Sequence, residues 1–308
     1  KMRGWFLKET KTIDVDCGTG TNITLWTRED KVYRITPRQN DAVNSCWMPD
    51  SHRLNYKYIN AETRIPQPVI RTDAEAPPRP PTWDPARPPA AEAVKRIAPN
   101  QLAIIASGRM TNEELYMVRH LAAQIGTDMV DIVPRMGESD GMLISADRNP
   151  NTNGARLVLD IEPGSRLDAI REGVRSGSIK GILSLGEDLI SPEAGFTAED
   201  LDKLDYLFMT AHSANETARH ADLVLPGVTY AEKFGTMINV TGRIQRLNRA
   251  IQPIGYARDD WQIFRDITLL LGGNPALKDF NSALDILTAM STEYGALNGV
   301  SWGSIGDG

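Results

Sequence analysis

The chain has 308 residues, 41% of them hydrophobic, and a formal net charge of −6. This size and composition suit a globular protein with one large and one small domain. The acidic balance, without a long basic run, argues against a nucleic-acid partner. Every apolar run is shorter than the roughly 18–20 residues that cross a bilayer, so direct membrane insertion is not expected. Two cysteines are too few for a disulfide scaffold, and they favour a reducing, cytoplasmic setting.

Residues 1–71 predict a small β-rich domain. Apolar and polar residues alternate in Thr21–Thr27 and in Lys31–Thr36, as in two strands of a hairpin with one buried face. The polar residues Arg28-Glu29-Asp30 supply the turn between these strands. A proline-rich linker is expected over residues 72–99, because its prolines fix backbone dihedrals, remove hydrogen-bond donors and favour extended polyproline geometry.

Residues 100–290 predict an α/β domain with a parallel sheet, because strand-like and helix-like segments alternate there. The expected strands are Leu102–Ile105, Asp128–Val133, Arg156–Leu159 (a strand or the start of a loop), Gly181–Leu185, Tyr206–Met209 and Leu223–Leu225. The expected helices are Thr111 to near Gly126, Leu167–Arg175, Leu201–Leu204, a short turn after His212 and Asp259–Leu271. The fold class is therefore α/β, a parallel Rossmann-like sheet domain beside the β-rich one, with a tail at 291–308.

The stretch from Ala221 to Gln245 carries the most specific pattern. It reads A-D-x-V-L-P and then E-x-x-G-T-x-x-N-x-x-G-R-x-Q, and the match continues through Asp260-Trp261. The pattern resembles the molybdopterin-oxidoreductase fold and, more closely, the large peripheral-arm G subunit of bacterial respiratory complex I, the 75-kDa subunit of mitochondria. Each polar residue of the pattern also has a structural interpretation, as a cap, a turn or an interdomain salt bridge.

The resemblance also implies where an iron–sulfur cluster sits in cluster-bearing relatives. Their C-x2-C-x3-C spacing and later W-M-C-D motif fall here on Asp14, Cys17, Thr21 and Pro49. A cubane cluster needs four thiolates, and Cys17 alone supplies one, with Cys46 three residues from the fourth position. We therefore expect no metal and no cofactor in this chain, and iron–sulfur clusters and FMN in partner segments or subunits.

In the molybdoenzymes that share this fold, loops at the strand ends hold a pterin dinucleotide, whose phosphates suit helix N-termini. The corresponding positions here are Ser107, Gly108, Thr111, Gly186, His212, Asn215 and Thr217. No cysteine follows Cys46, and Glu187, Asp188 and Glu216 would place negative charge near a pyrophosphate unless Lys or Arg offsets it. The expectation is a vestigial crevice without catalytic or cofactor-binding residues.

Three functions remain open at this point. The first is a structural module of the complex I peripheral arm, on the cytoplasmic side of the bacterial inner membrane. It would contact other peripheral-arm subunits and support electron transfer from NADH to quinone without its own redox centre. The second is a fragment of a molybdopterin-dependent oxidoreductase of formate-dehydrogenase type, and the third is a free-standing nucleotide-binding domain. In the resembled family further iron–sulfur segments precede this point, so a fragment or a split gene is expected.

Overall fold

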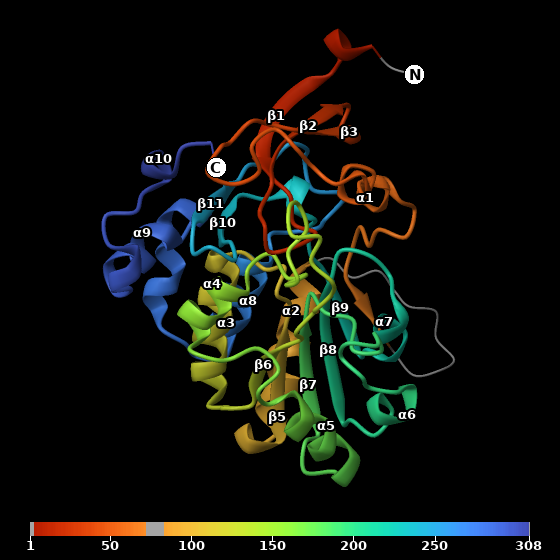
Figure 1. The fold of residues 1–308 in the computed structure, drawn as a ribbon. Helices are drawn as coiled ribbons and strands as arrows, with labels where there is room; N and C mark the ends of the chain where they lie inside the picture. The colour runs from red at the N-terminus through yellow and green to blue at the C-terminus, as the bar shows by residue number, and fades with distance from the viewer. Residues whose placement is uncertain (1–2, 72–82, 308) are drawn as a thin grey trace.

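The computed structural model describes residues 3–71 and 83–307. A six-stranded sheet with helices on both faces forms the larger part, and a smaller β-rich part lies beyond one end of its strands (Figure 1). We call the smaller part the β lobe; it comprises residues 3–65 and the hairpin 235–247. The predicted fold class, α/β with a parallel sheet and a small β-rich N-terminal region, is confirmed.

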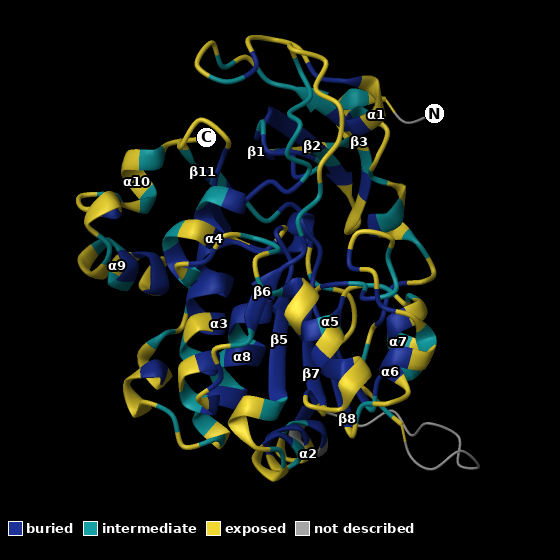
Figure 2. Cartoon of the chain, turned by 60° about the horizontal axis from the view of Figure 1, so that its bottom comes forward, coloured by how far each residue is buried: buried dark blue, intermediate teal, exposed yellow. Residues whose placement is uncertain are grey.

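The central sheet has the order β4-β9-β8-β7-β5-β6, and all neighbours are parallel except β4 and β9. Its strands are β4 (Val69–Ile70), β5 (Leu102–Ala106), β6 (Val130–Ile132), β7 (Gly181–Leu185), β8 (Tyr206–Ala211) and β9 (Leu223–Pro226). The residues of β5, β7 and β8 are all buried, as expected of parallel strands covered on both faces (Figure 2). Loops at the carboxyl ends of these strands therefore face the β lobe.

Two layers of helices cover this sheet. One face packs against α2 (Trp83–Arg96), α3 (Asn112–Ile125), α4 (Thr152–Leu159), α8 (Asp260–Leu270) and α9 (Ala283–Glu293). The other face packs against α5 (Leu167–Ser176), α6 (Ala198–Leu201) and α7 (Glu216–His220). Alternation along β5 serves both layers, because Leu102 and Ile104 belong to the first core and Ala103 and Ile105 to the second.

The β lobe contains an antiparallel sheet and a hairpin. Its strands are β1 (Lys8–Ile13), β2 (Asn22–Arg28), β3 (Lys31–Pro37), β10 (Gly235–Ile238) and β11 (Ile244–Leu247); the short helices α1 (Asp50–Arg53) and α10 (Trp302–Ile305) lie near it (Figure 1). The predicted hairpin is present, and Glu29 and Asp30 turn with φ of 50° and 55°. Ile23 and Leu25 share one apolar core with Met237 and Leu247, so two segments distant in sequence build this lobe together.

Three sequence-based assignments were wrong. Helix α2 occupies much of the expected linker; its exposed Pro88 and Pro89 face solvent, while Ala86 and Ala90 are buried in the core. The rest of that prediction, residues 72–82, lies outside the described residues. Segment 156–159 ends helix α4 instead of forming a strand or loop, and the helix expected at 201–204 lies earlier, at α6. Burial against the sheet outweighed local proline and β-propensity signals in the first two cases.

No helix in the described part of the chain combines the length and apolar character needed to span a bilayer.

Candidate functional site

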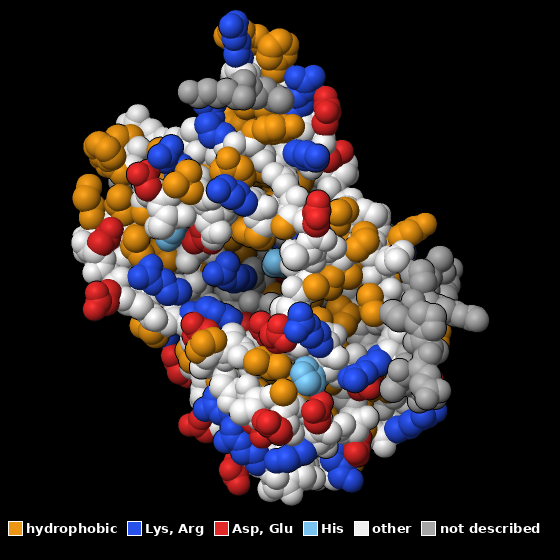
Figure 3. Space-filling view, turned by 90° about the vertical axis from the view of Figure 1, so that its right-hand side faces the viewer, with side chains coloured by type: hydrophobic (Ala, Val, Ile, Leu, Met, Phe, Trp, Pro, Cys, Tyr) orange, Lys and Arg blue, Asp and Glu red, His pale blue; other side chains and the backbone are white. Residues whose placement is uncertain are grey.

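A pocket lies where the carboxyl ends of the parallel strands meet the β lobe. Its cavity volume is about 70 Å³, and it is bordered by Ser107 after β5, Gly186 after β7 and His212 after β8. Val15 and Tyr58 close it from the β lobe. In the space-filling view the surface is hollowed between the two parts of the molecule, with basic, acidic and histidine side chains at the rim (Figure 3). The end of a parallel sheet is where α/β folds keep their ligand crevice.

The structure brings only some of the seven candidate residues together. Ser107, Gly186 and His212 line the pocket. Thr111 is fully buried and caps α3 through the predicted capping box with Glu114. The other members are also engaged with the protein: the Asn215 side chain caps α7, the Thr217 hydroxyl donates to Asp188, and a Cβ at Gly108 would collide with Asn149.

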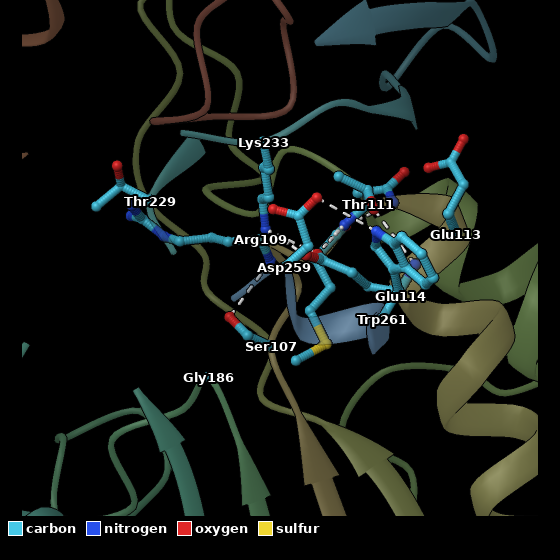
Figure 4. A network of polar contacts seen from close by, with 12 residues as sticks. Ser107, Arg109, Thr111, Glu113, Glu114, Gly186, Thr229, Lys233, Asp259 and Trp261 are labelled. Carbon is cyan, nitrogen blue, oxygen red and sulfur yellow. Dashed lines mark hydrogen bonds and ion pairs between the residues drawn. The ribbon is translucent and has the colours of Figure 1, made fainter. Parts of the chain in front are cut away.

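Sequence reasoning missed Lys233, which lies at the centre of this region. Its Nζ lies 2.8 and 2.7 Å from the two carboxylate oxygens of Glu114, and both side chains are buried. Figure 4 shows Lys233 pointing at Glu114, beside Asp259 and Trp261. Burial alone would lower the pKa of Lys233, but the carboxylates of Glu114, Asp260 and Asp259 together outweigh burial, and the pKa is raised. Lysines are rarely buried unless they are paired, so the burial of Lys233 beside a carboxylate would have marked it as important. That burial cannot be deduced from a single sequence.

Several further carboxyl groups are buried around this pair. Burial, reinforced by Glu114, raises the pKa of Asp260 to about 7. Burial also raises the pKa of Asp259 to about 6 and that of Glu113 to about 7. Gly227 lets the Asp260 carboxylate approach, because a Cβ there would stand 2.8 Å from its oxygens. The chain's own charged side chains therefore occupy much of the sheet end.

We expect the stability cost of Glu113→Gln to shrink as the pH rises from about 4.5 to about 7. The raised pKa means that the folded protein binds more protons than the unfolded chain in this window, so wild-type stability falls there. A glutamine does not titrate and escapes that fall, which amounts to at most about 3 kcal/mol. Urea unfolding of both proteins across this pH range measures it. If the free energies of unfolding of the two proteins changed in parallel with pH, the raised pKa of Glu113 would be contradicted.

A second ion pair ties the β lobe to the sheet. Arg64 donates to Glu232 at 2.6 Å, to the carbonyl of His212 at 2.9 Å and to that of Ile59 at 2.8 Å. Glu232 also accepts from the Thr229 amide at 2.7 Å. The motif residue Glu232 is thus a cap and an interdomain salt bridge at once.

The rest of the motif is structural as well. The Asn239 carboxamide accepts from the Thr241 and Arg243 amides and donates to the carbonyl of Thr19. Gln245 donates to the Gly20 carbonyl at 2.8 Å, where φ is +66°. These contacts hold residues 17–21 against the β10–β11 hairpin.

The negative charge of Glu187, which was expected to repel a pyrophosphate, is offset because Arg135 donates to its carboxylate at 2.9 Å.

The positions that the resemblance assigns to cluster ligands are Asp14, Cys17, Thr21 and Pro49, two of which lie in the loop 17–21. Cys17 is buried, and its thiol donates to the Thr19 hydroxyl at 3.3 Å. Asp14 is buried and pairs with His52, whose Nδ1 lies 2.6 Å from a carboxylate oxygen. Thr21 is buried, and Pro49 directly precedes α1. Cys46 is exposed.

Two family models match the chain. Residues 7–57 match the NADH-ubiquinone oxidoreductase NDSU1/NuoG-like 4Fe-4S domain. Residues 148–268 match molybdopterin oxidoreductase. The two matches correspond to most of the β lobe's first segment and to much of the α/β part, in the order in which the resemblance placed them.

Curated relatives extend over nearly the whole chain. The mitochondrial 78 kDa subunit of NADH-ubiquinone oxidoreductase from Candida albicans is 25% identical, over 92% of this chain and 55% of that protein. The G subunit of NADH-quinone oxidoreductase from Rickettsia conorii is 22% identical, over 87% of this chain and 56% of that protein. The chain is a homologue of this large complex I subunit. It spans about half the length of these relatives.

Two further proteins are similar to this complex I subunit homologue, one in sequence over part of the chain and one in fold. A candidate formate dehydrogenase of Staphylococcus haemolyticus is 32% identical, over 46% of this chain and 15% of that protein. The solved structure of acetylene hydratase from Pelobacter acetylenicus superposes with a TM-score of 0.68, at 10% identity, over 95% of this chain and 73% of that one. The structural likeness shows a shared fold.

The expectation that this chain has no cofactor is contradicted, because residues 7–57 match a 4Fe-4S domain. The number of cysteines shows how many thiolate ligands the chain can supply. It does not show whether the domain is present, because the family model matches the sequence of the whole stretch. The residues at the family's ligand positions nevertheless do not fit a four-thiolate cage. Among the described residues, Cys17 offers the single buried thiol, beside a carboxylate at 14, a hydroxyl at 21 and a proline at 49.

Proposed function

We propose that this complex I subunit homologue is a structural module of the peripheral arm of the respiratory complex. In that role it supports electron transfer from NADH to quinone by holding neighbouring subunits in place, on the cytoplasmic side of the bacterial inner membrane. Its partners are other peripheral-arm subunits. The homology to the large peripheral-arm subunit over about nine-tenths of the chain supports this assignment.

The buried charge network at the sheet end is the observation that carries a structural role. Lys233, Glu114 and Asp260 are buried where a molybdopterin enzyme of this fold would open its crevice. Arg64 and Glu232 then join the sheet end to the β lobe by a fully buried ion pair. Desolvated pairs of this kind are costly to open, so they favour a fixed arrangement over a crevice that admits and releases a ligand.

Co-purification from native membranes tests this proposal. An affinity-tagged copy of the chain, expressed in its own host and extracted in mild detergent, is expected to bring down flavin- and iron–sulfur-containing subunits with NADH-oxidising activity. An untagged strain controls for non-specific capture. Recovery of the chain as a soluble homo-oligomer with its own substrate turnover would contradict the proposal.

The second candidate function is a fragment of a molybdopterin-dependent oxidoreductase of formate-dehydrogenase type. The 32% identity to the Staphylococcus haemolyticus protein over 46% of this chain favours it. The two candidates differ in what the purified protein contains. Formate-dependent dye reduction by the tagged material, together with molybdenum, would support the enzyme and exclude the scaffold.

A further inference from the structure

The loop beside the expected cluster positions gathers a different set of donor groups. Asp14, Asp16 and His52 each offer one ligand atom, and these atoms all lie within 4.8 Å of one another. Asp14 and His52 are buried, and Asp16 is partly buried. The set contains two carboxylates and one imidazole and includes no sulfur. Carboxylate oxygen and imidazole nitrogen are the donors that divalent transition metals such as Zn²⁺ accept.

The geometry is compatible with a single ion. Metal–ligand distances of about 2.0–2.2 Å place two ligand atoms at most about 4.4 Å apart across an ion. Small side-chain rotations would therefore bring these three groups onto one centre. The hydrogen bond of 2.6 Å between His52 Nδ1 and Asp14 would give way to metal ligation, which needs a neutral imidazole.

The surroundings orient one of the carboxylates. Asn55 donates to Asp16 Oδ1 at 2.9 Å, as outer-shell partners of metal ligands commonly do. Arg109 is the competing cation, with its guanidinium 3.7 Å from Asp16. Its side chain is 43% exposed, so it can turn away toward solvent when an ion arrives.

An independent observation also points to a metal here. All three residues lie inside the stretch 7–57, which matches a domain named for a metal cluster. Asp14 stands at the position that the resemblance assigns to the first cluster ligand.

We propose that Asp14, Asp16 and His52 bind one divalent transition-metal ion, with water completing its coordination. The site goes beyond the scaffold role and does not depend on it. Ligation by two carboxylates and one imidazole leaves Cys17 outside the site. Zn²⁺ is the first ion to test, because it accepts both oxygen and nitrogen ligands and has no redox chemistry of its own.

Calorimetric titration of Zn²⁺ into the chelator-treated full chain, with any partners it retains, tests the site. We expect one ion per chain and at least ~10-fold weaker binding in Asp16→Asn. Asp16 is the residue to change first, since it is outside the buried Asp14–His52 pair and its loss leaves that pair intact. Cys17→Ser is the matched control and is expected to bind as the wild type does.

Co²⁺ in place of Zn²⁺ gives a second readout that does not depend on a variant folding. Oxygen and nitrogen ligation predicts visible ligand-field bands without the near-ultraviolet charge-transfer band of a cobalt thiolate. Absence of binding, binding unchanged in Asp16→Asn, or a thiolate band lost in Cys17→Ser would each overturn the proposal. Loss of the visible bands in His52→Gln, with an unchanged circular dichroism spectrum, would support it.

Discussion

Replacing Lys233 with methionine is expected to destabilise the fold by about 3–5 kcal/mol, the usual cost of removing one partner from a buried pair. Glu114 has no exposed surface and would keep a carboxylate with no cation beside it. Burial and the Glu114 charge already raise the pKa of the nearby Asp260 to about 7. Removing the lysine would leave the repulsion between these two carboxylates without a neighbouring cation. Urea unfolding at neutral pH, followed by circular dichroism, measures the loss.

A matched control and a double variant separate the ion pair from lost packing. Lys95→Met changes an exposed lysine with a surface partner, Glu92, and is expected to cost less than about 1 kcal/mol. Adding Glu114→Gln to Lys233→Met is expected to recover much of the loss, because both charges are then gone while a glutamine still accepts from the Thr111 amide. A Lys233→Met protein as stable as the Lys95→Met control would show that the pair does not hold the sheet end together.

Arg64→Met is expected to have an effect of similar size, about 3–5 kcal/mol. The substitution leaves the buried Glu232 without the Arg64 cation and removes the donors to the carbonyls of Ile59 and His212. Because Arg64 links the β lobe to the sheet, its loss is also expected to separate their unfolding into two transitions. Calorimetry of the variant measures both effects.

The control for this variant is Arg219→Met. Arg219 pairs with Glu216 on an exposed helix surface and is expected to contribute less than about 1 kcal/mol. A single transition at the wild-type temperature in Arg64→Met would mean that the apolar core, which Ile23 of the β lobe shares with Tyr230 and Ala231 outside it, joins the two parts without help from the ion pair.

Much of the fold could be predicted because its signals are local. The capping box at Thr111 and the positive-φ glycines Gly126 and Gly177 mark helix ends with residues close in sequence. The apolar run at 102–105 marks a strand buried on both faces. Helix α2 could not be predicted, because distant contacts offset its prolines: Ala86 and Ala90 pack in the core, and Trp83 donates to the carbonyl of Tyr256 at 2.6 Å.

The candidate site was predicted less well, because it depends on distant partners. Ser107, Gly186 and His212 were recognised from the resemblance and do line the pocket. Lys233 meets Glu114 across 119 positions in the chain, and no spacing rule covers such a pair. The same holds for Asp14 and His52, 38 positions apart. The sequence placed Asp14 only at a position where relatives have a cysteine ligand, and it gave no sign that His52 lies beside Asp14 in the fold.

The central claim is that the chain's own side chains occupy the sheet end where related enzymes keep a pterin cofactor. Measuring molybdenum by mass spectrometry and pterin by fluorescence after oxidation, on tagged protein purified natively with its partners, tests it most directly. The account predicts background levels of both, in wild type and in the Lys95→Met control alike. Stoichiometric molybdenum and pterin that travel with this chain, and are lost from an Arg109→Ala variant at the pocket, would contradict it.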